Sequence, residues 1–127
     1  MTELQARELI DNYLEGYNCF DVAGMLSCLH RDVVFENVSD GIVTLRTDGK
    51  AAFEAQAAQA LALFMERNQS VRAFRLHADC AKVDIDYSAI TATDWPNGWK
   101  AGTMFRLTGQ SVFTFRDGLI ASIQDIS

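Results

Sequence analysis

Residues 103–126 read TMFRLTGQSVFTFRDGLIASIQDI, and their alternating apolar side chains predict a β-hairpin that turns over residues 116–118. A two-residue loop would put Phe113 on the same face as the polar Ser122. A three-residue loop with Gly118 in the left-handed region keeps that face apolar. We therefore predict the three-residue loop.

This register determines which side chains face the interior. The predicted inward face consists of Ser111, Phe113, Phe115, Leu119, Ala121, Ile123 and Asp125. The opposite, mixed face consists of Val112, Thr114, Ile120, Ser122 and Gln124. The carboxylate of Asp125 thus ends an apolar face, where lost hydration would raise its pKa unless a hydrogen-bond donor compensates.

Composition places limits on the class of protein. A chain of 127 residues with 49% hydrophobic residues can form a single domain, residues 1–127, without disulfides or metal. A net charge of −6 and scattered basic residues argue against nucleic acid as a partner. Three cysteines, an odd number, predict buried free thiols in a reducing compartment. With no signal-peptide pattern and no membrane-length apolar stretch, we expect a cytoplasmic protein that does not bind membranes.

The first half of the chain predicts three helices. Thr2 can cap the first, whose apolar stripe is Ala6, Leu9, Ile10, Tyr13, Leu14 and Tyr17. Asp21 can cap a short second helix that ends at Leu29. Asp48 can cap a long third helix over residues 50–68, with Phe53 and Phe64 on one side.

The remaining segments predict strands. Residues 33–38 alternate, with Val33, Phe35 and Asn37 on one face, and a turn at 39–41 leads into a short arm over 42–46. From Val71 onward a period of two predicts strands over residues 71–78, 81–93, 100–108, 109–116 and 119–126. Helices followed by a meander predict an α+β fold.

Motifs for familiar chemistries are missing. The glycines form no dinucleotide or phosphate-binding motif, and no histidine motif suggests a hydrolase triad. His30 and His77 lack the spacing of metal ligands. We therefore expect no cofactor and no metal, which leaves Tyr, Asn and Asp on apolar faces as the candidate chemical groups.

At these residues the chain resembles the nuclear transport factor 2-like superfamily, in particular its SnoaL-like and ketosteroid isomerase-like branch. The resemblance covers the whole length and rests on the order of elements, the run from Tyr13 to Asn37, and the segments 109–113 and 116–120. It implies a cone in which three helices pack against a curved, mostly antiparallel sheet. It also implies a ligand pocket at the open end and a homodimer through the sheet face.

Two branches of the superfamily imply roles for individual residues. Tyr13 matches the oxyanion-stabilising tyrosine of the isomerases, but Asn37 stands in place of their proton-shuttling Asp and Ser111 in place of their neutral carboxylic acid. An amide is not a general base, so we do not expect steroid isomerisation by that mechanism. In the limonene epoxide hydrolase-like enzymes, Asn37 resembles a water-positioning Asn and Asp125 an acid or base.

The epoxide hydrolase mapping departs from the family at two positions. Phe35 replaces a water-holding Tyr, Asp84 replaces a bridging Arg, and Asp86 would be the second Asp. Strand alternation places Asp84 and Asp86 toward solvent. Their neighbours on the strand face inward: Val83, Ile85 and Tyr87.

We predict that Tyr13, Asn37 and Asp125 form a catalytic set. The other predicted pocket residues are Tyr17, Phe35, Phe53, Tyr87, Trp95, Trp99, Phe105, Ser111 and Phe113. The expected reaction is cofactor-independent acid/base chemistry, of isomerase, cyclase or hydratase type, on a small apolar carbonyl, enol or epoxide compound. The alternative is a non-catalytic module that binds a hydrophobic ligand or another protein, with the same side chains serving as core, strand-end or dimer contacts.

Overall fold

The computed structural model describes residues 1–127. Its helices are α1 (Glu3–Asn18), α2 (Val22–Leu26) and α3 (Lys50–Ala60), and a 3₁₀ turn, η1 (Leu61–Leu63), follows α3. Its strands are β1 (Leu29–Ser39), β2 (Ile42–Asp48), β3 (Phe64–His77), β4 (Cys80–Thr91), β5 (Met104–Arg116) and β6 (Leu119–Ile126).

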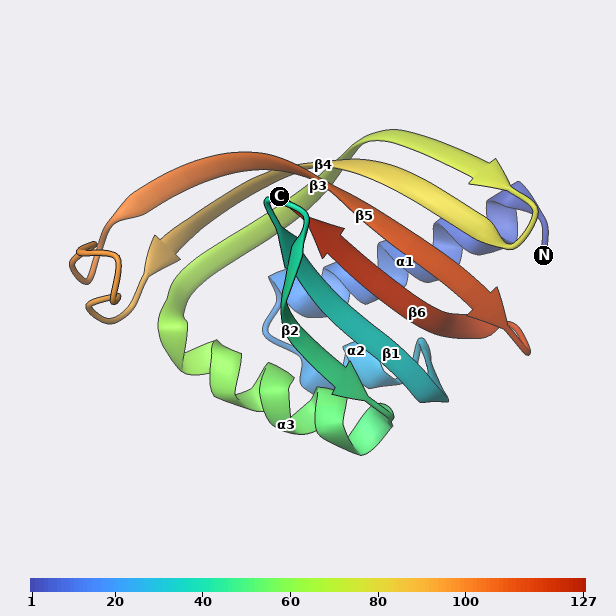
Figure 1. Ribbon diagram of the computed structural model, residues 1–127, viewed down its shortest axis with the longest axis horizontal. Coiled ribbons are helices and arrows are strands. Elements are labelled where there is room, and N and C mark those ends of the chain that lie inside the picture. The colour runs from blue at the N-terminus through green and yellow to red at the C-terminus, as the bar shows by residue number, and fades with distance from the viewer.

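The six strands form one curved, open sheet in the order β2-β1-β6-β5-β4-β3, with the helices on its concave side (Figure 1). β1 and β6 run parallel, and all other neighbouring strands are antiparallel. The predicted α+β architecture is thus confirmed. The long strands β3, β4 and β5 arch over α1.

Helix α1 begins and ends on specific side chains. Thr2 and Gln5 form a reciprocal capping box at its start, as the sequence predicts for Thr2. At its end the Asn18 amide bonds both backbone groups of Gln69 on β3, at 2.7 and 3.1 Å. These contacts fix the last turn of α1 against the sheet.

Several predicted boundaries are wrong because sheet pairing overrides helix propensity. Helix α2 ends at Leu26, and Leu29 already pairs with Ile120 in the sheet. Helix α3 ends at Ala60 rather than residue 68, because residues from Phe64 onward pair with β4. Asp48 does not cap α3, since its carboxylate binds Arg46 at 2.9 Å. The two strands predicted over 100–108 and 109–116 are one continuous strand, β5.

The β5–β6 turn also differs from the prediction. Arg116 pairs with Leu119, so the loop has two residues, Asp117 and Gly118, with φ of 56° and 75°. Such a type I′ turn matches the twist of the strands. The pairing shifts at Ala121, which forms a bulge opposite β5.

The bulge changes which side chains face inward near the turn. Ile120, predicted to face outward, is fully buried. Beyond the bulge the predicted phase holds, and Ile123 is buried beside the core residue Phe113. Ile120 therefore does not belong to the exposed sheet face, and the homodimer through that face stays a prediction.

Gly118→Val should destabilise the protein by about 1 kcal/mol or more, because a β-branched residue is strained at φ of +75°. A Cβ at this position would touch nothing within 4 Å, so backbone strain alone would be measured. Urea unfolding should show the loss, and Asp40→Asn, at another turn position of positive φ, serves as the control because Asn tolerates that φ. Equal stability of Gly118→Val and the unmodified protein would contradict this turn geometry.

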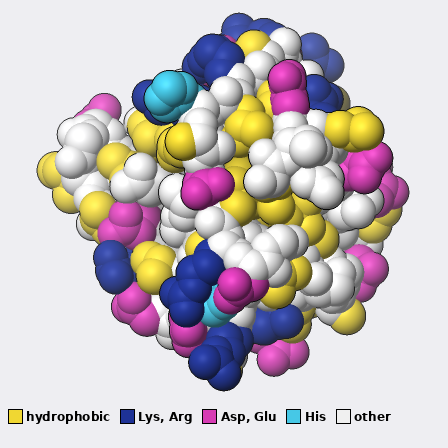
Figure 2. Space-filling view, turned by 90° about the vertical axis from the view of Figure 1, so that its right-hand side faces the viewer, with side chains coloured by type: hydrophobic (Ala, Val, Ile, Leu, Met, Phe, Trp, Pro, Cys, Tyr) yellow, Lys and Arg dark blue, Asp and Glu magenta, His cyan; other side chains and the backbone are white.

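The surface mixes charges of both signs. Figure 2 shows one end of the molecule, where Lys and Arg side chains lie interspersed with Asp and Glu around a hydrophobic centre. All three cysteines are free, but Cys19 is exposed rather than buried as predicted. No helix combines the length and apolar composition that crossing a bilayer requires.

Candidate functional site

A cavity of about 250 Å³ lies between the helices and the sheet. It is lined by Tyr13, Tyr17, Met25, Phe35, Asn37, Leu45, Phe53, Gln56, Ala57, Ala60, Leu63, Phe64, Arg67 and Asp125. Most of these side chains are apolar, as is usual for a small-molecule site. The three predicted catalytic residues, which are far apart in the sequence, all reach this cavity.

Sheet pairing brings the polar groups together. Asn37 on β1 lies directly opposite Asp125 on β6, and Ser111 on β5 lies opposite Asp125 on the other side. Tyr13 reaches the same space from the buried stripe of α1. β6 lies between β1 and β5 in the sheet, and this position brings the polar groups of the site together.

Asp125 is partly buried, and its carboxyl has one direct partner. The Ser111 hydroxyl donates a hydrogen bond to its Oδ1 at 2.7 Å. Burial raises the pKa of Asp125 to about 6, although the bond from Ser111 acts in the opposite direction. A carboxyl with this pKa can both accept and return a proton near neutral pH.

Tyr13 is only 4% exposed, and its hydroxyl has no hydrogen-bond partner in the protein. Burial, and secondly the charge of Asp125, raise its pKa well above the usual value, so the hydroxyl stays protonated. The ring packs edge-on against Phe113, with ring centres 6.1 Å apart, and at a tilt against Phe53. Tyr13 is therefore a fixed donor that faces the cavity.

A second hollow of about 370 Å³ adjoins the first and shares Tyr17, Asn37 and Asp125 with it. Tyr87 and Ser111 line this second hollow rather than the first. The hydroxyls of Tyr17 and Tyr87 lie 2.8 Å apart, and burial raises the pKa of both. This pair marks the boundary between the two hollows.

Four predicted pocket residues line neither hollow: Trp95, Trp99, Phe105 and Phe113. The two tryptophans turn toward each other across the β4–β5 connection and stack with Phe105, whose ring centre lies 4.6 Å from that of Trp99. Phe113 is 1% exposed and lies beneath Tyr13 in the core. These four side chains therefore make their aromatic contacts outside the cavity.

Asp84 and Asp86 point away from the cavity, as strand alternation predicts. Asp84 lies 3.4 Å from Arg75, and Asp86 lies 3.8 Å from Arg72, on the outer side of β3 and β4. Val83 and Ile85 are buried instead. Neither aspartate reaches Asp125, so the cavity lacks the Asp-Arg-Asp arrangement of the epoxide hydrolase mapping.

Sequence reasoning missed Arg67 and Phe64, which both line the cavity. Both were assigned to the third helix, whereas both lie on β3. The poor helix formers Asn68 and Ser70 were the available signal of a strand. The structure brings no group of three His, Cys, Asp or Glu side chains together in a metal-binding arrangement.

Comparison with known proteins agrees with this architecture. Residues 10–123 match the SnoaL-like domain family. A candidate polyketide cyclase from Xanthomonas campestris is 20% identical, with a TM-score of 0.82 over 98% of this chain and 90% of that protein. A candidate hydroxylase, AclR from Streptomyces galilaeus, is 15% identical, with a TM-score of 0.77 over 98% and 89%.

A further similar structure is TerC, co-crystallised with polyporic acid, which is 22% identical, with a TM-score of 0.77 over 96% of this chain and 90% of that one. No curated protein matches the sequence. At these identities the structures show the shared fold, and the family match covers most of the sequence. The chain therefore belongs to the SnoaL-like domain family.

Proposed function

We propose that this protein is a cofactor-independent acid/base enzyme for a small, largely apolar carbonyl, enol or epoxide compound. The observation that carries the proposal is the Asp125 carboxyl, which has a raised pKa and lines an apolar cavity together with the unpartnered Tyr13 hydroxyl. Strongly shifted carboxyl groups in cavities are typical of catalytic sites. The candidate polyketide cyclase among the similar structures supports a cyclase or isomerase type of reaction.

In the proposed reaction, the Asp125 carboxylate removes a proton from the carbon beside a substrate carbonyl. The electron pair of that C–H bond forms a C=C bond with the carbonyl carbon, the π pair of the carbonyl moves onto its oxygen, and Tyr13 stabilises the resulting enolate by a hydrogen bond. The protonated Asp125 then returns the proton, either to the γ-carbon when an unsaturated substrate gives a dienolate, or to the alkoxide that forms when the enolate carbon attacks a second carbonyl of the substrate and the π pair of that carbonyl moves onto its oxygen. Asn37, beside Asp125, orients the substrate by its amide.

The test uses a substrate that needs only the first step. With 2-tetralone in D₂O, proton NMR should show exchange of the α-protons faster than in buffer alone. The enzyme-dependent rate should rise as pH increases through about 6, because only the ionised Asp125 is a base. Asp125→Asn should lower this rate by about 100-fold.

Asp84→Asn is the matched control, because it removes a carboxylate of the same sheet outside the cavity and should leave the rate unchanged. If the unmodified protein binds 2-tetralone, seen as line broadening, but does not accelerate exchange, the catalytic proposal fails. The chain would then be the non-catalytic ligand-binding module.

A further inference from the structure

We propose that Arg67 forms an anion-binding site within the cavity, which receives a carboxylate or ionised enol oxygen of the ligand. This inference rests on the proposed function, since it names the charge of the ligand bound in the same cavity. Arg67 belongs to β3 and lines the cavity that also contains Tyr13 and Asp125.

The guanidinium of Arg67 is buried without a counter-ion. Arg67 is 5% exposed, and no carboxylate lies within ion-pair distance of it. Its Nε donates a hydrogen bond to the Tyr17 backbone oxygen at 2.8 Å, while its Nη2 is sealed from water and has no partner. A buried, unpaired charge is unfavourable, and an anionic ligand oxygen would offset that cost.

Aromatic rings hold this guanidinium in one orientation. Its central carbon lies 3.7 Å from the ring centre of Tyr17 and 4.7 Å from that of Phe20. Cation–π contacts of this kind occupy the faces of the guanidinium and leave its N–H edge to bind oxygen atoms. The group is therefore preorganised for a planar anion.

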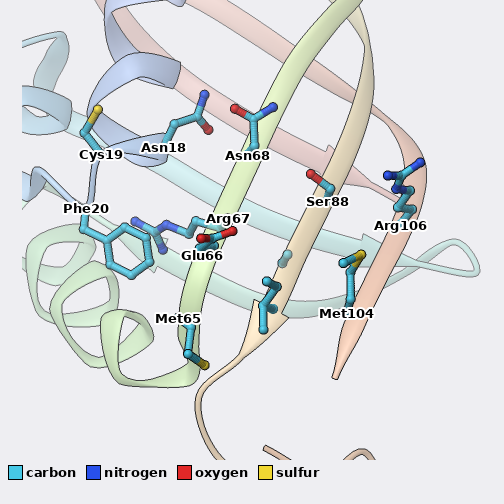
Figure 3. Close-up of a pocket in the computed structure, with 12 residues that line it drawn as sticks. Asn18, Cys19, Phe20, Met65, Glu66, Arg67, Asn68, Ser88, Met104 and Arg106 are labelled. Atoms are coloured by element: carbon cyan, nitrogen blue, oxygen red, sulfur yellow. The ribbon is translucent and has the colours of Figure 1, made fainter. Parts of the chain in front are cut away.

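Arg67 lies between the inner cavity and a surface groove of about 510 Å³. Figure 3 shows the groove, with the Arg67 side chain extending from β3 toward Phe20 and away from Ser88 and Arg106. The groove is open and mixed in character, whereas the inner cavity is mostly apolar and contains Asp125. The groove also contains the Glu66 carboxyl, but only the inner cavity combines Arg67 with Tyr13, Asn37 and Asp125.

Arg67 and Asp125 have opposite charges, yet they do not form an ion pair. Each is left to interact with a ligand, and the apolar side chains of the same cavity would contact the rest of that ligand. This arrangement fits a compact apolar molecule that carries one anionic oxygen. The carboxylate of Asp125 would repel such an oxygen, which favours its placement at Arg67.

The test compares a two-ring acid with its neutral isostere, 2-naphthoate and 2-naphthamide, by isothermal titration calorimetry at about pH 8. The unmodified protein should bind the acid about tenfold more tightly or better. Arg67→Gln should abolish that preference, and Arg67→Lys should retain part of it. Asp125→Asn should maintain or increase the preference, because it removes a negative charge from the cavity.

If Arg67 has a purely structural role, Arg67→Gln should lower the affinities for both probes equally and leave the ratio of the two affinities unchanged. That result would overturn the inference. If Arg67→Gln does not fold, NMR of the unmodified protein decides: the Arg67 Nε–H resonance should shift with 2-naphthoate and not with 2-naphthamide. No shift, or no preference for the acid, overturns the anion site while leaving Asp125 chemistry to the exchange assay. A cavity that takes up neither probe also overturns the anion site, and the exchange assay with 2-tetralone tests the Asp125 chemistry separately.

Discussion

Asp125→Asn should stabilise the folded protein at about pH 8 by roughly 2–3 kcal/mol, although it removes a proposed catalytic group. The pKa of Asp125 is raised to about 6 in the folded state, whereas an unfolded Asp titrates at about 3.9. The folded protein therefore binds this proton more tightly than the unfolded chain does. Stability from this group is greatest below about pH 4 and is lost as pH rises through about 6.

Asparagine carries no charge at any of these pH values, so the variant avoids the cost of burying a carboxylate. It also keeps an oxygen that can accept the bond from Ser111. Urea unfolding between about pH 4 and pH 8 should show the two curves nearly converging at the acidic end, separating between about pH 4 and 6, and keeping a constant difference above that. Asp84→Asn, outside the cavity beside Arg75, should show no such gain, and parallel curves for Asp125→Asn would contradict the raised pKa.

Phe113→Ala should destabilise the protein by about 4 kcal/mol, the largest stability effect we predict. Phe113 is 1% exposed, pairs with Ile123 across the β5–β6 ladder, and supports the ring of Tyr13 edge-on. Removal of the ring leaves a cavity that the rigid sheet fills only in part. Tyr13 would also lose its lateral support, so the folded variant should bind the ligand more weakly in addition to being less stable.

Phe105→Ala is the control for this substitution, because Phe105 belongs to the half-exposed aromatic cluster with Trp95 and Trp99. It should cost about 1–2 kcal/mol and leave the affinity for 2-naphthoate unchanged. Denaturant unfolding gives the stabilities, and calorimetry gives the affinities. Similar losses in the two variants would mean that Phe113 is not the central core residue that its burial indicates.

The inward orientation of Asp125 was predicted correctly, but through two errors that cancel. The actual loop is one residue shorter than predicted, which shifts the phase of β6 once. The bulge at Ala121 shifts it back, so Ile123 and Asp125 face inward while Ile120 does so too. A bulge depends on pairing with a partner strand, and alternation along a single strand does not reveal it.

Arg67 could not be predicted as a cavity residue from its own segment. The Ala-rich stretch before it continues helically to Ala60, and only pairing with β4 establishes a strand from Phe64 onward. A positively charged residue within a polar run also indicates exposure under ordinary burial preferences. The contacts that bury it come from Tyr17 and Phe20, which are distant in sequence.

The central position of β6 has a consequence for biosynthesis. β1 and β2 are made first, then β3, β4 and β5, yet β1 contacts the latter group in the sheet only through β6. While a ribosome extends the chain, the two groups of strands have no shared edge until residues 119–126 have been translated. Each exposes an unpaired strand during that interval, which is the state most prone to misassociation. Asp125 joins the cavity in the same late step, so the sheet and the site are completed together.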